Sequence, residues 1–253
     1  MKSNVRFAVP RTAALLTLIA FALIIAACGG AVVSQPTIAP ATSIPPTAVA
    51  GGVLPLDAGN VLPWLSVYFT NPDPPDQVNN GVDRQIVPLI NAARRRIDAA
   101  FFDFNLPSVV NALINAHRRG VEVRLVLDVQ AARGRDAFDA LAALKNANLS
   151  FVDGGRSNGL MHEKLLIIDS TVLFVGSWNA SWNDTLRNNN NILRITNQRL
   201  IANYQRVFDN MYEAQLFGRR RPEGAQTPRM TIDGVVVENY FAPSDGVMAK
   251  IVA

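Results

Sequence analysis

Residues 162–179 read HEKLLIIDSTVLFVGSWN, and this stretch decides the fold. It contains two apolar runs, at 164–169 and 172–176, which are separated by the small polar pair Ser170-Thr171. Short apolar runs bounded by turn residues are typical of strands that are buried on both faces. The stretch therefore predicts two neighbouring buried strands joined by a tight turn.

Outward from this pair, strands alternate with helices. Strands are predicted at 66–70, 97–104, 121–128, 149–152 and 191–196, and helices at 82–96, 107–119, 136–146 and 198–217. The strands are nearly continuously apolar, as in VEVRLVLD at 121–128, while the helices show apolar residues at helical spacing. This pattern indicates an α/β fold with a buried, mixed, largely parallel sheet flanked by helices.

The same stretch carries candidate chemistry. Side chains on a strand repeat every second residue, so His162 and Lys164 point to the same side. The returning strand can deliver Ser177 and Asn179 close to them. Such a set suits a phosphate ester, because an ammonium and an amide can bind the non-bridging oxygens while an imidazole attacks phosphorus.

The spacing H-x-K-x4-D-x6-G-S-x-N resembles the motif of the phospholipase D superfamily at every position. The resemblance implies an α/β/α sandwich in which His162 is the nucleophile and forms a phosphohistidine. It also implies that Lys164 and Asn179, helped by Ser177, bind the phosphate. Asp169 is counted with the catalytic residues, in a structural or orienting role. The resemblance implies no metal and no cofactor.

Two departures from the family pattern bear on activity. The family's active site normally combines two copies of the motif, and one His protonates the leaving oxygen while the other attacks. This chain has one copy, and His117 has no Lys two residues on. Many relatives carry a Glu that orients the catalytic His where this chain has Asn190, which we expect to face the substrate site. Because this chain has one copy of the motif, we expect a homodimer in which two chains together complete the active site.

The C-terminal segment offers another explanation for the missing copy. Residues 237–247 echo residues 66–72 and the Gly81-Val82 pair that opens the first helix. In two-lobed relatives such a strand begins the second lobe. We therefore predict a phospholipase D-like domain at 64–218, followed at 219–253 by a linker and the stub of a possible second lobe. The alternative is a self-contained C-terminal strand that happens to be similar.

The N-terminus predicts export. Residues 1–27 combine three basic residues with an apolar run at 13–27, as in a signal peptide. Ile25-Ala26-Ala27-Cys28 resembles a bacterial lipobox, which implies lipidation of Cys28 and a membrane-anchored lipoprotein of the cell envelope. A Pro-, Thr- and Ala-rich linker follows at 28–63. The alternatives are an ordinary cleaved signal peptide, hence a secreted protein, or a retained transmembrane anchor.

Composition excludes several classes of protein. One Cys among 253 residues excludes an internal disulfide framework, and two His exclude a Cys/His zinc site. The net charge is +4, but three of the 24 basic residues lie in the signal peptide, so the remainder carries 21 basic against 20 acidic side chains. Bulk charge therefore gives no argument for a nucleic-acid partner.

These observations predict a phosphodiesterase that hydrolyses or transfers a phosphodiester. Its substrate is either a phospholipid, at the membrane to which the lipid anchor would hold it, or a nucleic acid, as for an endonuclease. The alternative is a catalytically incomplete half-enzyme that binds phosphate or a polyanion. A purely structural tethered surface protein is a third reading.

Overall fold

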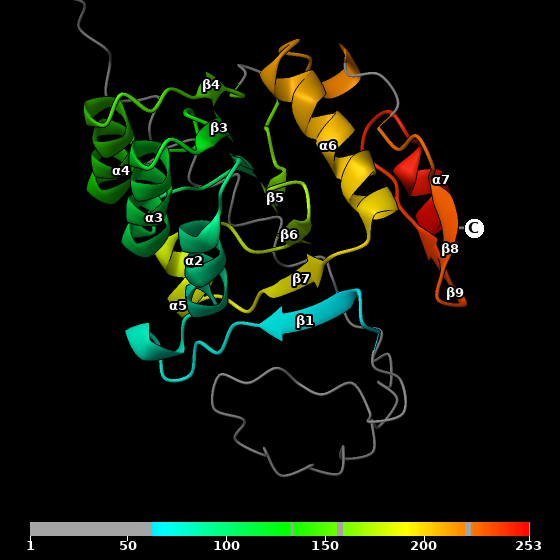
Figure 1. Ribbon diagram of the computed structural model, residues 1–253, viewed down its shortest axis with the longest axis horizontal. Helices are drawn as coiled ribbons and strands as arrows, with labels where there is room; N and C mark the ends of the chain where they lie inside the picture. The colour runs from blue at the N-terminus through cyan, green and yellow to red at the C-terminus, as the bar shows by residue number, and fades with distance from the viewer. Residues whose placement is uncertain (1–61, 133, 156–158, 221–223, 253) are drawn as a thin grey trace, which may run out of the picture. The chain divides into compact units, whose positions relative to one another are not determined.

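The computed structural model describes residues 62–132, 134–155, 159–220 and 224–252 (Figure 1). The predicted signal peptide at 1–27, the candidate lipidation site Cys28 and all but the end of the predicted linker at 28–63 lie outside the described residues. None of the described helices has the length and apolar character needed to cross a membrane.

The described chain is built around a seven-stranded mixed sheet with the strand order β1-β7-β6-β5-β2-β3-β4. Its strands are β1 (Leu65–Phe69), β2 (Arg96–Phe101), β3 (Glu122–Leu127), β4 (Val152–Asp153), β5 (Lys164–Ile168), β6 (Val172–Gly176) and β7 (Asn191–Ile195). The predicted mixed sheet is confirmed, although only the β2–β3 and β3–β4 pairs are parallel and the other pairs are antiparallel. The turn at 169–171 explains part of this difference, because so short a connection cannot form the crossover that a parallel pair requires.

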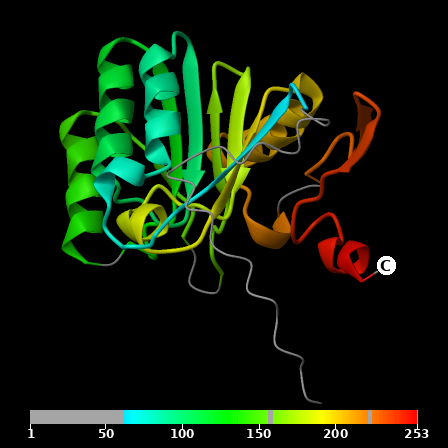
Figure 2. The same cartoon turned by 90° about the horizontal axis from the view of Figure 1, so that it is seen from below.

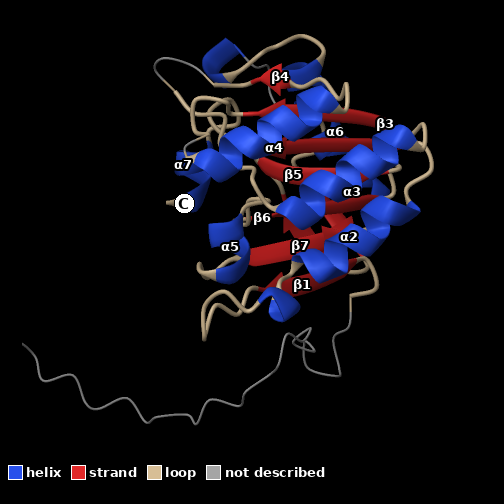
Figure 3. Cartoon of the chain, turned by 90° about the vertical axis from the view of Figure 1, so that its left-hand side faces the viewer, coloured by secondary structure: helices blue, strands red, loops and turns tan. Residues whose placement is uncertain are grey.

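Helices cover both faces of this sheet, as an α/β/α sandwich requires (Figures 2 and 3). One face carries α2 (Asp83–Ala92), α3 (Pro107–Arg118) and α4 (Arg135–Asn146), and the other carries α6 (Gln198–Tyr212). The alternation of side chains along β5 serves both layers: Leu166 and Ile168 join the core under α2–α4, while Leu165 and Ile167 join the core under α6. The remaining short helices are η1 (Val78–Asn80), α5 (Trp182–Leu186), η2 (Gly218–Arg220) and α7 (Val247–Ile251).

Two helices are shorter than the sequence predicts. Helix α2 ends at Ala92 rather than at residue 96, because the backbone N–H groups of residues 94–96 are bound by the carboxylate of Asp169 and β2 already begins at Arg96. Helix α6 ends at Tyr212 rather than at residue 217, and the chain turns away at Gln215, whose φ is +50°.

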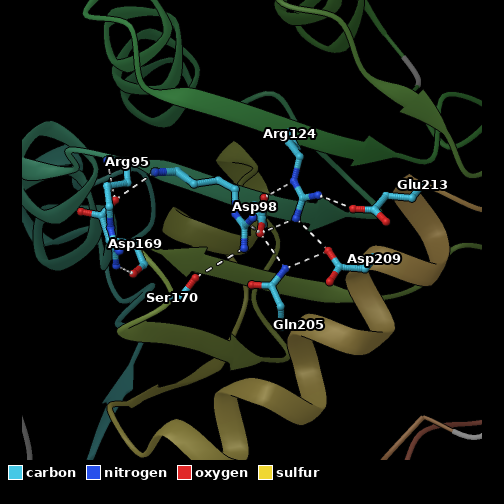
Figure 4. Close-up of polar contacts among 9 residues, drawn as sticks. Arg95, Asp98, Arg124, Asp169, Ser170, Gln205, Asp209 and Glu213 are labelled. Atoms are coloured by element: carbon cyan, nitrogen blue, oxygen red, sulfur yellow. Dashed lines mark hydrogen bonds and ion pairs between the residues drawn. The ribbon is translucent and has the colours of Figure 1, made fainter.

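A buried ion-pair network joins α6 to the sheet (Figure 4). Arg124 of β3 donates to Asp98 of β2 through Nε at 2.6 Å, and to Asp209 and Glu213 at 2.8 and 3.0 Å. Asp98 is 1% exposed and Arg124 is 6% exposed, so this charge pair is held in the interior.

The C-terminal segment packs against α6. Strands β8 (Arg229–Ile232) and β9 (Val235–Glu238) form a hairpin separate from the main sheet. The Nδ2 of buried Asn203 donates to the carbonyl of Thr227 at 3.0 Å and to Oδ1 of Asn239 at 3.2 Å, and the ring of Phe241 lies 4.8 Å from that of Tyr204. The sequence did not predict β8. The assignment of 219–253 as a linker and second-lobe stub stays a prediction.

Candidate active site

The predicted site lies at one edge of the sheet, where β5 begins and where β2 and β6 end. Because β5 is antiparallel to both neighbours, Lys164 at its start pairs with Phe101 at the end of β2, and Leu165 pairs with Val175 near the end of β6. This register brings the segment before β5, which carries His162, close to the segment after β6, which carries Ser177 and Asn179. The predicted convergence of His162, Lys164 and the segment after β6 follows from this topology.

His162 is exposed, and contacts with neighbouring residues fix the segment that carries it. The backbone N–H of Met161 donates to Oδ2 of Asp128 at 2.9 Å, and Asp128 itself is buried at the end of β3. The imidazole meets the ring of Phe102 edge-on, with 4.8 Å between the ring centroids. A buried carboxylate and an aromatic ring therefore fix the segment that carries the imidazole.

Lys164 contacts the same aromatic ring. Its Nζ lies 5.5 Å from the centroid of Phe102 and donates to the backbone carbonyl of His162 at 3.1 Å. The two side chains are on one side of the chain, as their spacing predicts. The imidazole and the ammonium thus lie together over Phe102.

Asn179 lies at this edge too, but its amide is largely engaged. Its Oδ1 accepts from the backbone N–H groups of Phe102 and Asp103 at 3.2 and 3.1 Å, and its Nδ2 donates to Oδ2 of Asp184 at 2.8 Å. An amide nitrogen has two hydrogens, so one donor is left for a substrate oxygen. A phosphate contact from Asn179 would come from this second N–H.

Ser177 and Asn190 pair with each other. The hydroxyl of Ser177 donates to Oδ1 of Asn190 at 2.8 Å and accepts from the backbone N–H of Asn191 at 3.1 Å. Asn190 Nδ2 donates to the carbonyl of Asp184 at 2.9 Å. The expected contact between Asn190 and the imidazole of His162 is not formed among the described residues. Asn190 instead orients the serine hydroxyl.

Asp169 is the motif residue that the structure places elsewhere. It follows the far end of β5, five residues and about 16 Å from Lys164. Its carboxylate accepts from the backbone N–H groups of Arg94, Arg95 and Arg96 at 2.8–3.0 Å. Figure 4 shows Asp169 beside Arg95. Asp169 therefore lies too far from His162 to touch a phosphate there, and any part it has in catalysis is indirect. Its role is the structural one that the resemblance allowed.

Several residues of the site were missed by sequence reasoning. They are Phe102, Asp103, Asp128 and Asp184. Asp128 had a signal, because it is the carboxylate that ends the apolar run VEVRLVLD. Asp184 follows Ser181 by three residues, which is the spacing of a helix N-cap pair, and Ser181 is indeed the N-cap of α5. Phe102 carries no such signal, since aromatic residues abound in buried strands.

The surroundings favour a neutral imidazole. Burial lowers the pKa of His162 below 6.5, the ammonium of Lys164 lowers it further, and Glu163, Asp128 and Asp184 offset part of the shift. Burial also lowers the pKa of Lys164, against the attraction of Asp184, Glu163 and Asp103. A neutral imidazole has a free lone pair, which a nucleophile needs.

Two cavities flank the segment that carries His162. One, of about 530 Å³, has a mostly apolar and aromatic wall. Its lining residues are Leu160, Met161, His162, Glu163, Val175, Tyr204, Met211, Phe217, Gly218, Tyr240, Phe241, Ala242, Pro243 and Val247. The other, of about 410 Å³, has a more polar wall that includes Asp103 and Asp128. Among the described residues that line them, neither cavity includes Arg or Lys.

Metal ligands do not gather in the part of the chain that the structure describes: no group of three or more His, Cys, Asp and Glu residues there is placed to hold an ion.

Comparison with known proteins matches both the motif and the fold. The family described as "Cardiolipin synthase, PLD-like domain" matches residues 86–212. The mitochondrial cardiolipin hydrolase of Xenopus tropicalis is 33% identical over 132 residues, which are 51% of this chain and 60% of that protein. The phospholipase D of Rickettsia conorii is 32% identical over 140 residues, 55% of this chain and 65% of that protein. The chain therefore spans less than two thirds of the length of either relative.

A solved structure shares the fold. Nuc from Salmonella typhimurium, a phospholipase D family member, superimposes with a TM-score of 0.50 at 22% identity, over 58% of this chain and 93% of Nuc. The family match extends over 127 of 253 residues, from α2 to the end of α6, and includes every residue of the motif. The chain belongs to the phospholipase D-like family.

Proposed function

We propose that this protein is a phosphodiesterase that acts through a phosphohistidine at His162. A ring nitrogen of the neutral imidazole attacks phosphorus, the P–O bond to the leaving alcohol breaks, and the alcohol oxygen takes up a proton. Water, or an alcohol in a transfer reaction, then attacks phosphorus, and the P–N bond breaks to regenerate the imidazole. The observation that carries the proposal is an exposed imidazole with a lowered pKa beside the ammonium of Lys164.

The other motif residues would stabilise the charge on phosphorus. Lys164 contacts the same ring of Phe102 as His162 does. Asn179 can donate its second Nδ2–H to a non-bridging oxygen, and Ser177 can do so once its hydroxyl leaves Asn190. The leaving oxygen also needs a general acid, and this chain has one motif. We propose that a second copy of the chain supplies it, so that two His162 side chains flank one phosphorus in a homodimer.

The cavity beside His162 favours a phospholipid over a nucleic acid. Its apolar, aromatic wall suits a glycerol backbone or an acyl chain, and pockets of this kind are typical small-molecule sites. A nucleic-acid site is expected to offer cations to successive phosphates, and the described lining residues of the two cavities include no Arg or Lys. The named relatives include cardiolipin hydrolases. Lipidation of Cys28 and anchoring in the cell envelope, also proposals, would keep the domain at a membrane.

The first test is turnover of bis(4-nitrophenyl) phosphate, with a chelator present, by the wild type, His162→Ala and His117→Ala. His117→Ala is the matched control, because it removes the other imidazole, in the last turn of α3. We expect metal-independent turnover that falls by at least about 10³-fold in His162→Ala and is unchanged in the control. A folded wild type without turnover would support the alternative, a half-enzyme that only binds phosphate.

The second test concerns the substrate class. Phospholipid vesicles that contain cardiolipin, and single-stranded DNA, are offered at equal phosphodiester concentration. We expect release of a phospholipid product and no cleavage of the DNA. Cleavage of the DNA alone would overturn the lipid assignment but leave the phosphohistidine mechanism standing.

A further inference from the structure

A polar network around Asp184 connects one half of the site. Asp184 is half-buried in α5. Its Oδ2 accepts from both the backbone N–H and the Nδ2 of Asn179, at 2.9 and 2.8 Å, and its Oδ1 accepts from Nδ2 of Asn188 at 2.7 Å. Its backbone carbonyl accepts from Nδ2 of Asn190 at 2.9 Å, and Asn190 in turn binds Ser177. One residue thus holds both polar side chains that follow β6.

This network sets the orientation of the Asn179 amide from both ends. The backbone N–H groups of Phe102 and Asp103 bind the amide oxygen, and the Asp184 carboxylate binds the amide nitrogen. Without the carboxylate, nothing described would hold Nδ2 in place. The direction of the remaining N–H donor therefore depends on Asp184.

The same carboxylate raises the pKa values of both Lys164 and His162 against the effect of burial. The negative groups that face Lys164 are, in order of influence, Asp184 of α5, Glu163 of its own segment and Asp103 after β2. Those that face His162 are Glu163, Asp128 after β3 and Asp184. Asp184 combines the largest carboxylate influence on Lys164 with the hold on Asn179.

We propose that Asp184 is a positioning residue of the phosphodiester reaction, one that orients the Asn179 amide and electrostatically supports the ammonium of Lys164. The proposal rests on the proposed function. It competes with a purely structural role, because Asp184 is also the third residue of α5 and its N–H faces the N-cap oxygen of Ser181 at 3.4 Å.

The pH profile separates these two roles. Loss of the negative charge in Asp184→Asn destabilises both His162⁺ and Lys164⁺, so both pKa values fall. Activity requires neutral His162 and charged Lys164, so both limbs of the kcat/KM profile should move toward acid, the alkaline limb by about one pH unit. We expect kcat for a soluble diester to fall about tenfold, because the variant has one acceptor oxygen where Asn179 and Asn188 now use two, which loosens the hold on Asn179. Asp184→Glu should keep the limbs in place.

The matched control is Asp76→Asn. Asp76 also binds the α5 region, through Nε1 of Trp182 at 2.9 Å and Nε of Arg187 at 2.7 Å, and it contacts no residue of the motif. The Asp76→Asn variant should lower the midpoint of thermal unfolding without moving either limb of the pH profile of kcat/KM. If Asp184→Asn lowers only the thermal midpoint and the folded fraction, like this control, Asp184 is a capping residue and the proposal fails.

A second readout does not need turnover. The chain contains four lysines, Lys2, Lys145, Lys164 and Lys250, so the Lys164 side-chain NMR signal can be assigned with Lys164→Arg. Its titration should move to lower pH in Asp184→Asn and not in Asp76→Asn. An unmoved Lys164 signal overturns the proposal. A moved signal in a protein without turnover supports the electrostatic part and shows that the proposed phosphodiesterase function is what failed.

Discussion

His162 and Asp169 belong to one motif, yet their surroundings give them different tasks. The imidazole belongs to a largely exposed residue and lies against an aromatic ring, and partial desolvation together with Lys164 lowers its pKa. The Asp169 carboxylate is charged and fully used by three backbone N–H groups at the opposite end of β5. Spacing alone cannot separate these tasks, because a five-residue strand carries its two ends to opposite edges of the sheet.

The pKa of His162 can be measured without activity. The chain has two His, so two imidazole signals are expected in an NMR titration, and His117→Ala assigns them. We expect the His162 signal to titrate below pH 6.5, because burial and Lys164 both disfavour the imidazolium. Lys164→Met should raise this midpoint but not restore it fully, since burial, the larger cause, remains. A midpoint at or above 6.5 in the wild type would contradict the assigned surroundings.

Asp169→Asn should affect stability rather than chemistry. The change removes a charged acceptor of three backbone hydrogen bonds, and we expect the free energy of unfolding at pH 7 to fall by about 1–2 kcal/mol. Burial raises the pKa of Asp169, but the backbone hydrogen bonds outweigh it, so the pKa in the folded protein is below 3.8. The stabilisation is therefore complete above the unfolded value and is lost as pH falls through the folded one.

Denaturant unfolding of the wild type and Asp169→Asn at pH 7 and at pH 3 checks this expectation. The difference between the two proteins should shrink at pH 3, and kcat per folded chain should be nearly equal at pH 7. A variant of normal stability with lost kcat would return Asp169 to the catalytic residues.

The sequence predicts that a strand or helix exists better than it predicts where that element ends or what it contacts. The β6 bounds, Val172–Gly176, agree with the prediction, because an apolar run between Thr171 and Ser177 leaves little choice. Asp169 shortens α2 through backbone contacts some 75 residues away, which local pattern cannot show. Gly176 is needed for a reason that was not predicted: a Cβ there would collide with the backbone carbonyl of Asn191 on β7.

The same limit applies to the candidate site. The motif predicts His162 and Lys164 side by side, and the structure confirms this over Phe102. The spacing of Ser181 and Asp184 could have indicated a helix N-terminus, but it could not predict that the Asp184 carboxylate binds Asn179. Polar contacts between different elements are settled by the fold and not by spacing in sequence.

Arg124 is the main polar link between α6 and the sheet, and its removal should be costly. Arg124→Met leaves the carboxylate of Asp98 buried without its closest partner, and we expect a loss of about 3 kcal/mol in the free energy of unfolding. The loss should lie at the lower end of the range for broken buried pairs, because Arg96 and Gln205 still contact Asp98. Denaturant unfolding measures it.

The control is Arg135→Met, which breaks an exposed pair with Asp139 in α4. It should change stability by less than about 0.5 kcal/mol. The double variant Asp98→Asn/Arg124→Met should be more stable than Arg124→Met alone, because no unpaired charge remains inside. Equal costs for Arg124→Met and Arg135→Met would show that the network does not hold α6.

The described part of the chain supplies one imidazole at the site, whereas a phosphodiester displacement needs both a nucleophile and a general acid. Among the described residues, no second imidazole lies at the site, since His117 is in α3. Exposure of His162 at the sheet edge leaves room for a partner. In a two-fold dimer, one surface pairs with itself, so a residue close to the two-fold axis faces its own copy. Dimerisation as a condition of activity therefore stays a proposal, and it can be tested.

Mixing experiments test this condition directly. Wild-type chains are co-refolded with a ninefold excess of His162→Ala, and turnover is expressed per wild-type chain. If each active site needs two His162 side chains, random pairing leaves about one wild-type chain in ten with a wild-type partner, so turnover per wild-type chain should fall about tenfold. With excess His117→Ala, turnover per wild-type chain should instead rise about tenfold, because those chains keep the catalytic imidazole and every pair is active. Constant turnover per wild-type chain with excess His162→Ala would mean that a single chain is sufficient, and the general acid would then have to be sought among its own groups near Lys164, first of all Asp103, whose pKa is raised by burial.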